Sequence, residues 1–225
     1  MFIIAVITQK GGSGKTTLSI NLAAAAAEAG HTPLVIDCDM QASACKWADR
    51  REKDLAPHVI DAQPSRLAGA IKTAEEQGID VIIIDTPPKS GEASAAAAKV
   101  ADVVIIPFEP QILDLETIEN TKDILQLAKN PPAIAVLNKV PPVGTRRQED
   151  AAAFLRQYGL AICAQSVSRR AIFGDATAMG KSVIEAEPQG KAAQEIREVY
   201  LQVIRFSGKQ ENMKHEQTGK LSRVG

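Results

Sequence analysis

The fold of this chain is constrained most by short, continuous apolar runs that are rich in β-branched residues. Five runs have this character: 2–8, 33–39, 81–85, 102–108 and 132–138. They lack the alternation of apolar and polar residues that a half-exposed strand shows, so we expect both faces of each strand to be buried. Strands of this kind form parallel sheets that helices cover on both sides. We therefore predict an α/β fold with a doubly wound, mostly parallel sheet and helices on both faces.

Alanine-rich segments with helical spacing connect these runs. The predicted helices span about 15–30, 41–54, 64–77, 91–101, 112–129, 146–158 and 190–206. Two weaker strands are predicted at 57–62 and 160–167. The alternation of strands and helices predicts right-handed crossovers within one domain over residues 1–206. Residues 207–225 are polar and almost free of large apolar side chains, so we expect a mobile tail.

Composition narrows the class of protein. The chain has 225 residues, enough for one sizeable core, and its 45% hydrophobic and 24% charged residues are ordinary for a soluble protein. No apolar run approaches the roughly 20 residues that span a bilayer, and the first ten residues lack a basic leader. Cys38, Cys45 and Cys163 form no CxxC pair, which argues against a disulfide framework or a zinc site. We predict a cytoplasmic protein.

A glycine-rich segment, TQKGGSGKTT at 8–17, follows the first predicted strand and opens the first predicted helix. In such a turn the backbone N–H groups converge on an anion, and the helix N-terminus adds a favourable partial charge. Lys15 can reach the β- and γ-phosphates, the Thr16 hydroxyl can ligate Mg²⁺, and Thr17 is placed for an outer phosphate contact. The remaining predicted phosphate-site residues are Gly11, Gly12, Ser13 and Gly14. The segment predicts a nucleotide site of the P-loop NTPase type.

This loop departs from the ordinary pattern G-x-x-x-x-G-K-[ST], because Gln9 stands at the first glycine position. It reads K-G-G-x-G-K-T-T instead, with Lys10 at its entrance. The pattern resembles the deviant Walker A motif of the ParA/MinD superfamily of ATPases. The resemblance implies ATP and Mg²⁺ as cofactors and a homodimer in the ATP state. It also implies that Lys10 reaches the phosphates bound by the second subunit, as an arginine finger would.

Three later strand ends resemble other motifs of the same superfamily. The segment VIDCDMQ is similar to its DxDPQ segment, which implies that Asp39 orients or activates the attacking water and that Asp37 lies near the magnesium shell. VIIIDTPP resembles a Walker B strand followed by a switch segment, with Asp85 holding Mg²⁺ through water. AIAVLNK ends in a residue, Asn138, that matches the one hydrogen-bonded to adenine in the family. All of these groups come at carboxyl ends of strands, where α/β sheets place ligands.

The resemblance covers nearly the whole chain up to about residue 206, including 169–185, with two departures. Met40 replaces the usual proline after the catalytic aspartate. Ser168 stands where family members commonly have the proline that packs near the base. Because base selectivity depends on this region, we expect ATP as the nucleotide but leave GTP as an alternative.

Features outside the nucleotide motifs separate the branches of the superfamily. The tail offers only Met213, Leu221 and Val224, which are too dispersed for an amphipathic membrane helix. The cysteines lack the spacing of iron–sulfur ligands, and the tail has no tyrosine, unlike the superfamily's bacterial tyrosine kinases. The chain is thus most similar to small ParA-type plasmid partition proteins that lack an N-terminal helix-turn-helix.

The distribution of charge suggests a polyanionic partner. Residues 1–138 carry 12 Lys and Arg against 18 Asp and Glu, whereas residues 139–225 carry 14 against 9. The ParA resemblance implies binding of double-stranded DNA without sequence preference, through contacts to phosphates. The best matches to the family's basic patch are Arg169 and Arg170. Further candidates are Arg146, Arg147, Lys181 and Arg205.

The expected function is an ATP-driven partition cycle. ATP closes a dimer that binds the nucleoid, and a ParB-like centromere-binding adaptor stimulates weak hydrolysis, which releases the dimer and so positions a plasmid. The same switch could instead position a protein cargo such as chemosensory clusters. An ATP-dependent metabolic ligase is the alternative from another class; a carboxylate substrate that raises turnover would favour it.

Overall fold

A single parallel sheet organises the chain. The computed structural model describes residues 1–52, 55–110, 115–141 and 146–208. The strands are β1 (Phe2–Val6), β2 (Pro33–Asp37), β3 (His58–Asp61), β4 (Val81–Asp85), β5 (Val103–Phe108), β6 (Ala133–Leu137) and β7 (Ala161–Ile162). Their order is β3-β2-β4-β1-β5-β6-β7, and every neighbouring pair among them is parallel. This confirms the predicted fold class.

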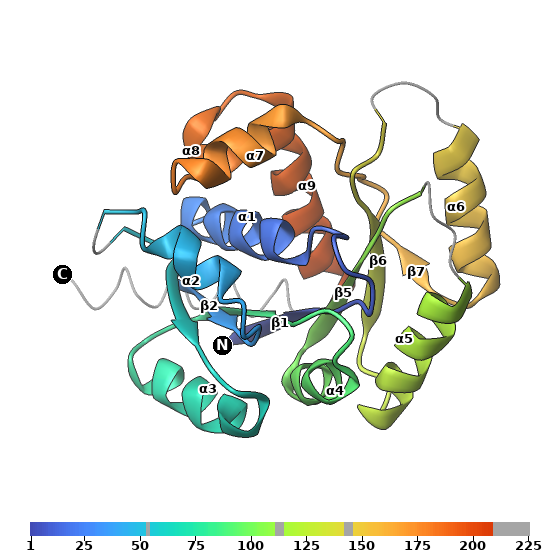
Figure 1. Cartoon of the computed structure of the whole chain (residues 1–225), viewed down its shortest axis with the longest axis horizontal. Coiled ribbons are helices and arrows are strands. Elements are labelled where there is room, and N and C mark those ends of the chain that lie inside the picture. Colours follow the sequence, from blue (N-terminus) through green and yellow to red (C-terminus); the bar gives the residue numbers. More distant parts are fainter. Residues whose placement is uncertain (53–54, 111–114, 142–145, 209–225) are drawn as a thin grey trace.

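Helices cover both faces of this sheet (Figure 1). They are α1 (Lys15–Glu28), α2 (Ser43–Ala48), the 3₁₀ turn η1 (Pro64–Arg66), α3 (Leu67–Glu76), α4 (Gly91–Val100), α5 (Leu115–Leu127), α6 (Arg146–Gln157), α7 (Ala171–Ala178), α8 (Val183–Ala186) and α9 (Lys191–Phe206). One apolar cluster joins the sheet to α1, α2, α7, α8 and α9, and the other joins it to α3, α4, α5 and α6. Within the described residues, no helix is both long and apolar enough to cross a membrane.

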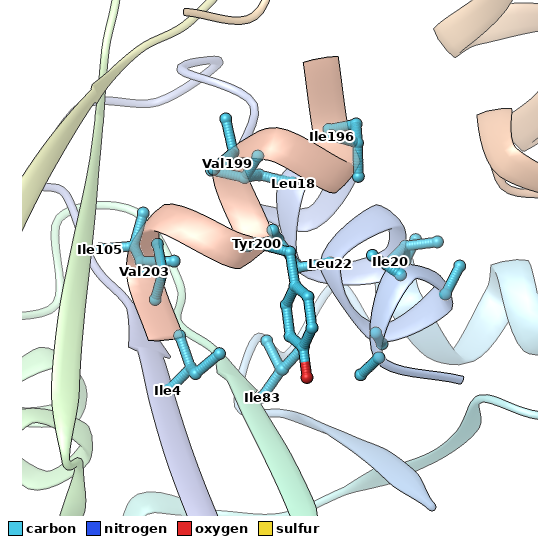
Figure 2. Packing of buried hydrophobic residues seen from close by; sticks show 14 of the residues in the cluster. Ile4, Leu18, Ile20, Leu22, Ile83, Ile105, Ile196, Val199, Tyr200 and Val203 are labelled. Atoms are coloured by element: carbon cyan, nitrogen blue, oxygen red, sulfur yellow. The ribbon is translucent and has the colours of Figure 1, made fainter. Parts of the chain in front are cut away.

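The continuous apolar runs are explained by these two clusters. Along β1, Ile4 belongs to the cluster under α1 and α9, whereas Ile3 and Ala5 belong to the opposite one. Figure 2 shows the first cluster, in which Tyr200 and other side chains of α9 lie against α1 and the sheet. Alternate residues of one strand therefore enter different cores, and neither face of the strand tolerates polar residues.

Helix α2 is much shorter than the predicted helix at 41–54. It begins only at Ser43, because Ala42 takes a left-handed conformation with φ 50°. Beyond its end the chain packs closely on the turn between α7 and α8. A Cβ added to Gly180 there would lie 2.8 Å from the backbone of Arg50. This contact comes from distant sequence, so the local helical pattern could not reveal it.

The predicted strand at 160–167 is also shorter, since β7 contains only two residues. The Gln202 side chain on α9 accepts hydrogen bonds from the backbone N–H groups of Ala164 (2.8 Å) and Gln165 (3.2 Å). These donors are therefore satisfied outside the sheet ladder, which lets the strand end early. The predicted tail was not tested, because residues 209–225 lie outside the described residues.

All three cysteines are free thiols. Cys38 and Cys163 are buried, and Cys45 is partly buried. Burial raises the pKa of the Cys38 thiol to about 12 and that of the Cys163 thiol to about 11. Both groups are therefore neutral at physiological pH and pack as small apolar side chains.

Candidate nucleotide site

The predicted site residues meet at one edge of the sheet. In the register of β2 and β4, Asp37 lies beside Asp85, and in that of β1 and β4, Val6 lies beside Asp85. The loop after β1 runs directly into α1 at this edge. Strand β1 lies between β4 and β5; the connection that leaves β1 runs to β2 on one side, whereas the connection that leaves its neighbour β5 runs to β6 on the other side. This is the topological switch point at which parallel α/β sheets bind ligands.

The loop between β1 and α1 has the backbone of a phosphate cradle. Gly14 is the N-cap of α1, with φ 89°. Because glycine has no side chain, it cannot accept hydrogen bonds from the first N–H groups of the helix, as a serine or aspartate N-cap would. The ammonium of Lys15 lies over the loop and donates to the carbonyl oxygens of Thr8 and Lys10, each at 3.4 Å. Burial lowers the pKa of Lys15, while Asp85 and Asp39 oppose that shift. An anion bound here would meet both the helix N-terminus and this ammonium.

Thr16 and Asp85, both predicted magnesium ligands, are in contact. The Thr16 hydroxyl donates to Oδ2 of Asp85 at 2.6 Å, and the Ser19 hydroxyl donates to Oδ1 at 3.2 Å. Burial raises the pKa of Asp85 to about 7, although the bond from Thr16 opposes the shift. Ser19 was missed by the sequence analysis; its position one turn after Thr16 on the same helix was the available signal.

The residues present fit a magnesium ion that shares its shell with phosphate. Within the described ranges, no group of three or more His, Cys, Asp and Glu side chains could hold a metal by itself. A hydroxyl and one carboxylate are the hard oxygen donors that Mg²⁺ uses when phosphates and water complete the shell. Thr16 and Asp85 supply that pair.

The two aspartates after β2 differ in their roles. Asp37 accepts the N–H groups of Asp39 (3.0 Å), Ala44 (2.9 Å) and Cys45 (3.3 Å), so its carboxylate caps the start of α2. Burial raises its pKa, and these three bonds oppose that shift. Asp39 is partly exposed, and within the described residues its carboxylate accepts one hydrogen bond, from the Gln41 N–H at 2.9 Å. Among the cavities beside the loop, one of about 370 Å³ is lined by Asp39 but not by Asp37.

That 370 Å³ cavity brings the predicted catalytic groups together. Lys15, Thr16 and Asp39 all line it. Lys10 stands at the loop entrance, where its backbone carbonyl accepts the Ser13 hydroxyl at 3.3 Å as well as the Lys15 ammonium. In the part of the chain that the structure describes, its own ammonium makes no hydrogen bond or ion pair. The backbone of Lys10 is thus fixed while its charge remains available.

Asn138 binds the phosphate loop itself. Its Nδ2 donates to the Ser13 carbonyl at 2.8 Å, and its Oδ1 accepts the Lys139 N–H at 2.9 Å. The Lys139 ammonium donates to the Gly12 carbonyl. The contact of Asn138 with adenine stays a prediction, while the structure gives the residue a role in shaping the loop. The role of Lys139 was missed by the sequence analysis.

The close approach of Asn138 to the loop predicts a sharp difference between two glycines. A Cβ on Gly14 would lie 2.5 Å from Nδ2 of Asn138, whereas a Cβ on Gly12 meets nothing within 4 Å. Both have positive φ, 89° and 74°, so alanine at either strains the backbone by about 1 kcal/mol. We expect Gly14→Ala to cost about 1 kcal/mol more than Gly12→Ala in the free energy of unfolding, because the Asn138 side chain must move away and lose its hydrogen bond to the Ser13 carbonyl.

Urea denaturation of the two alanine variants measures this difference. Gly12→Ala is the matched control, since it has the same backbone demand without the clash. Equal losses would contradict the close packing of Asn138 on the loop.

A second cavity, of about 640 Å³, lies beside the first. Its lining includes Asn138, Ser168, Arg169, Arg170 and Phe173. The structure thus brings the residues predicted near the base together with both residues predicted to bind DNA. Phe173 and Arg50, which also line it, were not predicted, because they come from α7 and from the turn after α2.

Both predicted DNA-binding arginines are in ion pairs. Arg170 donates to Oε1 of Glu195 at 2.8 Å, and the Ser168 N–H and hydroxyl bind the same carboxylate at 2.9 and 2.8 Å. Arg169 pairs with Glu109, but its side chain is 57% exposed, against 29% for Arg170. Of the two, Arg169 is therefore the more available to a phosphate. The further candidates Arg146, Arg147, Lys181 and Arg205 are exposed and come from α6, the α7–α8 turn and α9.

Comparison with known proteins agrees with this geometry. Residues 4–183 match the family model of the CobQ/CobB/MinD/ParA nucleotide binding domain. The chain is 31% identical over 213 residues to the maintenance of carboxysome distribution protein A of Halothiobacillus neapolitanus, covering 90% of this chain and 96% of that protein. It is 27% identical over 251 residues to the sporulation initiation inhibitor protein Soj of Bacillus subtilis, with 90% and 96% covered.

The fold also matches a solved structure, the septum site-determining protein MinD of Pyrococcus horikoshii in complex with Mg-ADP. The TM-score is 0.72 at 19% identity, and 92% of this chain and 97% of that chain are covered. With a family model that spans most of the chain and a relative matched over nearly its full length, the chain belongs to the CobQ/CobB/MinD/ParA family of nucleotide-binding domains.

Proposed function

We propose that this chain is a ParA-type ATPase in which ATP and Mg²⁺ drive the pairing of two copies, and that pairing controls attachment to DNA. The observation that carries the proposal is the combination of a fixed backbone and an unpaired ammonium at Lys10. Its backbone is fixed at the mouth of the phosphate loop, while its ammonium makes no hydrogen bond or ion pair within the described residues. The nucleotide bound by a second copy facing this loop would provide phosphates for this ammonium to bind.

Different residues of the chain have different roles in hydrolysis. Lys15 and the N–H groups at the start of α1 bind the β- and γ-phosphates. Thr16 and Asp85 would hold Mg²⁺, which neutralises charge on the transferred phosphoryl group. Asp39 orients or activates the attacking water from its place in the same cavity. Lys10 of each copy stabilises the charge that develops in the other copy's site.

DNA attachment and the cargo are the finer parts of the proposal. The paired state binds double-stranded DNA without sequence preference, so the protein is cytoplasmic and lies on the nucleoid when ATP is bound. Arg169 and the exposed basic residues of α6 and α9 contact phosphates. A ParB-like adaptor on a plasmid stimulates hydrolysis and releases the dimer.

A protein assembly is the second candidate cargo. The relative from H. neapolitanus, 31% identical, is named for the distribution of carboxysomes. In that case the adaptor would bind the assembly instead of a centromere. Both cargoes use the same ATP-dependent pairing, so one experiment tests the shared mechanism.

Replacing Lys10 with alanine tests the pairing. With a non-hydrolysable ATP analogue and Mg²⁺, we expect the wild-type protein to sediment as a dimer and to be retained on DNA. For Lys10→Ala, the affinity of the two copies for each other should fall about tenfold or more, because a charge-assisted contact across the interface is lost. The variant should therefore sediment mainly as a monomer at concentrations at which the wild type is a dimer. Its affinity for ADP should be unchanged, because the residue acts on the other copy.

Analytical ultracentrifugation measures pairing, and titration calorimetry measures the affinity for ADP. Lys72→Ala on α3 is the control, since its side chain is 79% exposed and outside the site. Pairing of Lys10→Ala at the wild-type level would refute the role of this lysine across the interface.

A further inference from the structure

Lys139 occupies the junction of the two cavities described above. The 370 Å³ cavity contains Lys15 and Thr16, so it receives the phosphates. The 640 Å³ cavity reaches away from the loop toward Phe173 and Ser168, so it is the space left for the sugar and the base. Four residues line both cavities: Gly14, Thr17, Lys139 and Thr177. Of these four, Lys139 carries the only charge.

The lysine is held at this junction from both ends. Its backbone N–H donates to Oδ1 of Asn138 at 2.9 Å, directly after β6. Its ammonium donates to the carbonyl oxygen of Gly12. Across the described residues no carboxylate forms an ion pair with it, so its charge is balanced by a carbonyl dipole alone. An anion at the junction would be a stronger partner than this carbonyl.

The backbone conformation of Lys139 allows its side chain to be tested by substitution with glycine. Its φ is 53°, in the left-handed region that is strained for a residue with a Cβ and that glycine adopts freely. A lysine at this position is therefore less stable than glycine would be, unless its side chain contributes.

We propose that Lys139 binds the α-phosphate of the nucleotide in the same subunit, at the point where the phosphate chain joins the nucleoside. The proposal rests on the nucleotide-binding function proposed above. In the absence of nucleotide, the ammonium stays on the Gly12 carbonyl. Since ADP and ATP share the α-phosphate, Lys139 contributes equally to the binding of both. Lys10, in contrast, contributes only to the paired ATP state.

Lys139→Gly tests the side chain without disturbing the backbone, because glycine keeps the left-handed conformation without strain. We expect its affinity for ADP to fall about tenfold or more, as for a lost charge-assisted hydrogen bond, with an equal fall for a non-hydrolysable ATP analogue. The affinity for adenosine, which has no phosphate, should stay at the wild-type level. Its melting temperature should be equal to or above that of the wild type. Titration calorimetry and thermal denaturation of the full chain give these values.

Lys129→Gly is the matched control, because Lys129 has φ 65° and is exposed after α5. It should gain similar stability and keep full affinity for ADP. Lys139→Met, which removes the charge but keeps a long side chain, should lose affinity as Lys139→Gly does.

The outcomes separate this proposal from the one on which it rests. If the wild type fails to bind ADP, the proposed function itself is wrong. If the wild type binds ADP and both Lys139 variants bind it equally well, the contact with the α-phosphate is wrong. An equal loss for adenosine and ADP would also overturn it, because the lysine would then act on the sugar or the base.

Discussion

Asp39→Ala is expected to lower the rate of ATP hydrolysis at least ~100-fold, because it removes the carboxylate that we propose orients or activates the attacking water. The structure holds this residue firmly. Its N–H donates to Asp37 at 3.0 Å, and its own carboxylate accepts the Gln41 N–H at 2.9 Å. It lines the same cavity as Lys15 and Thr16. Nucleotide binding and pairing should persist, because the phosphate cradle is made by other residues.

Phosphate release at saturating ATP measures the turnover, and ultracentrifugation with ATP and Mg²⁺ should show that the variant accumulates as a dimer. Asp49→Ala is the control, since Asp49 is an exposed carboxylate at the other end of α2. Turnover of Asp39→Ala at the wild-type rate would remove the residue from the mechanism.

The strands could be predicted well because their pattern is local. Strand β4 occupies the predicted residues 81–85, and each of the other four principal strands lies within its predicted run. Burial on both faces makes such runs unambiguous. The predicted strand at 160–167 is present only as the two residues of β7, because the side chain of Gln202 accepts hydrogen bonds from the N–H groups that would have continued the ladder. Gln202 lies about 40 residues away in sequence, so no local pattern predicts this interaction.

The site shows the same division between local and distant determinants. The phosphate loop and the contact of Thr16 with Asp85 follow from motifs that are local in sequence. Asp37 was expected near the magnesium shell, yet its carboxylate also caps α2, a role that depends on the unusual conformation of Ala42. The pairing of Arg170 with Glu195 could not be foreseen either, because counts of charge do not identify partners.

The largest loss of stability is expected at Arg51, which ties the end of α2 to the α7–α8 segment. Its side chain is 2% exposed and binds both carboxylate oxygens of Glu185, at 2.7 and 2.9 Å. It also donates to the Gly180 carbonyl at 2.8 Å and stacks on Trp47 at 4.3 Å. We expect Arg51→Met to lower the free energy of unfolding by about 3–5 kcal/mol, because it leaves a half-buried carboxylate without its partner.

A second substitution distinguishes the loss of the ion pair from the cost of leaving Glu185 charged without a partner. Glu185 also closes a capping box with Ser182, and glutamine can replace glutamate there. Adding Glu185→Gln to Arg51→Met should therefore recover part of the loss, since no uncompensated charge remains. Arg50→Met is the control, because the exposed Arg50 side chain makes a single hydrogen bond within the described residues, to the Thr177 carbonyl at 3.3 Å. This substitution should cost no more than about 1 kcal/mol.

Acid provides an independent check on the same pair. Burial acts to raise the pKa of Glu185, but the bonds from Arg51 and Ser182 outweigh it and hold the pKa below the ordinary value of 4.5. The pair therefore stabilises the wild type above that value and is lost as the pH falls through the lower pKa of the folded state. In Arg51→Met, protonation instead removes the stranded charge. The difference in unfolding free energy between wild type and variant, measured by urea denaturation, should thus be largest at neutral pH and shrink below pH 4.5. A difference independent of pH would show that the loss comes from the packing of Arg51 on Trp47 and not from the ion pair.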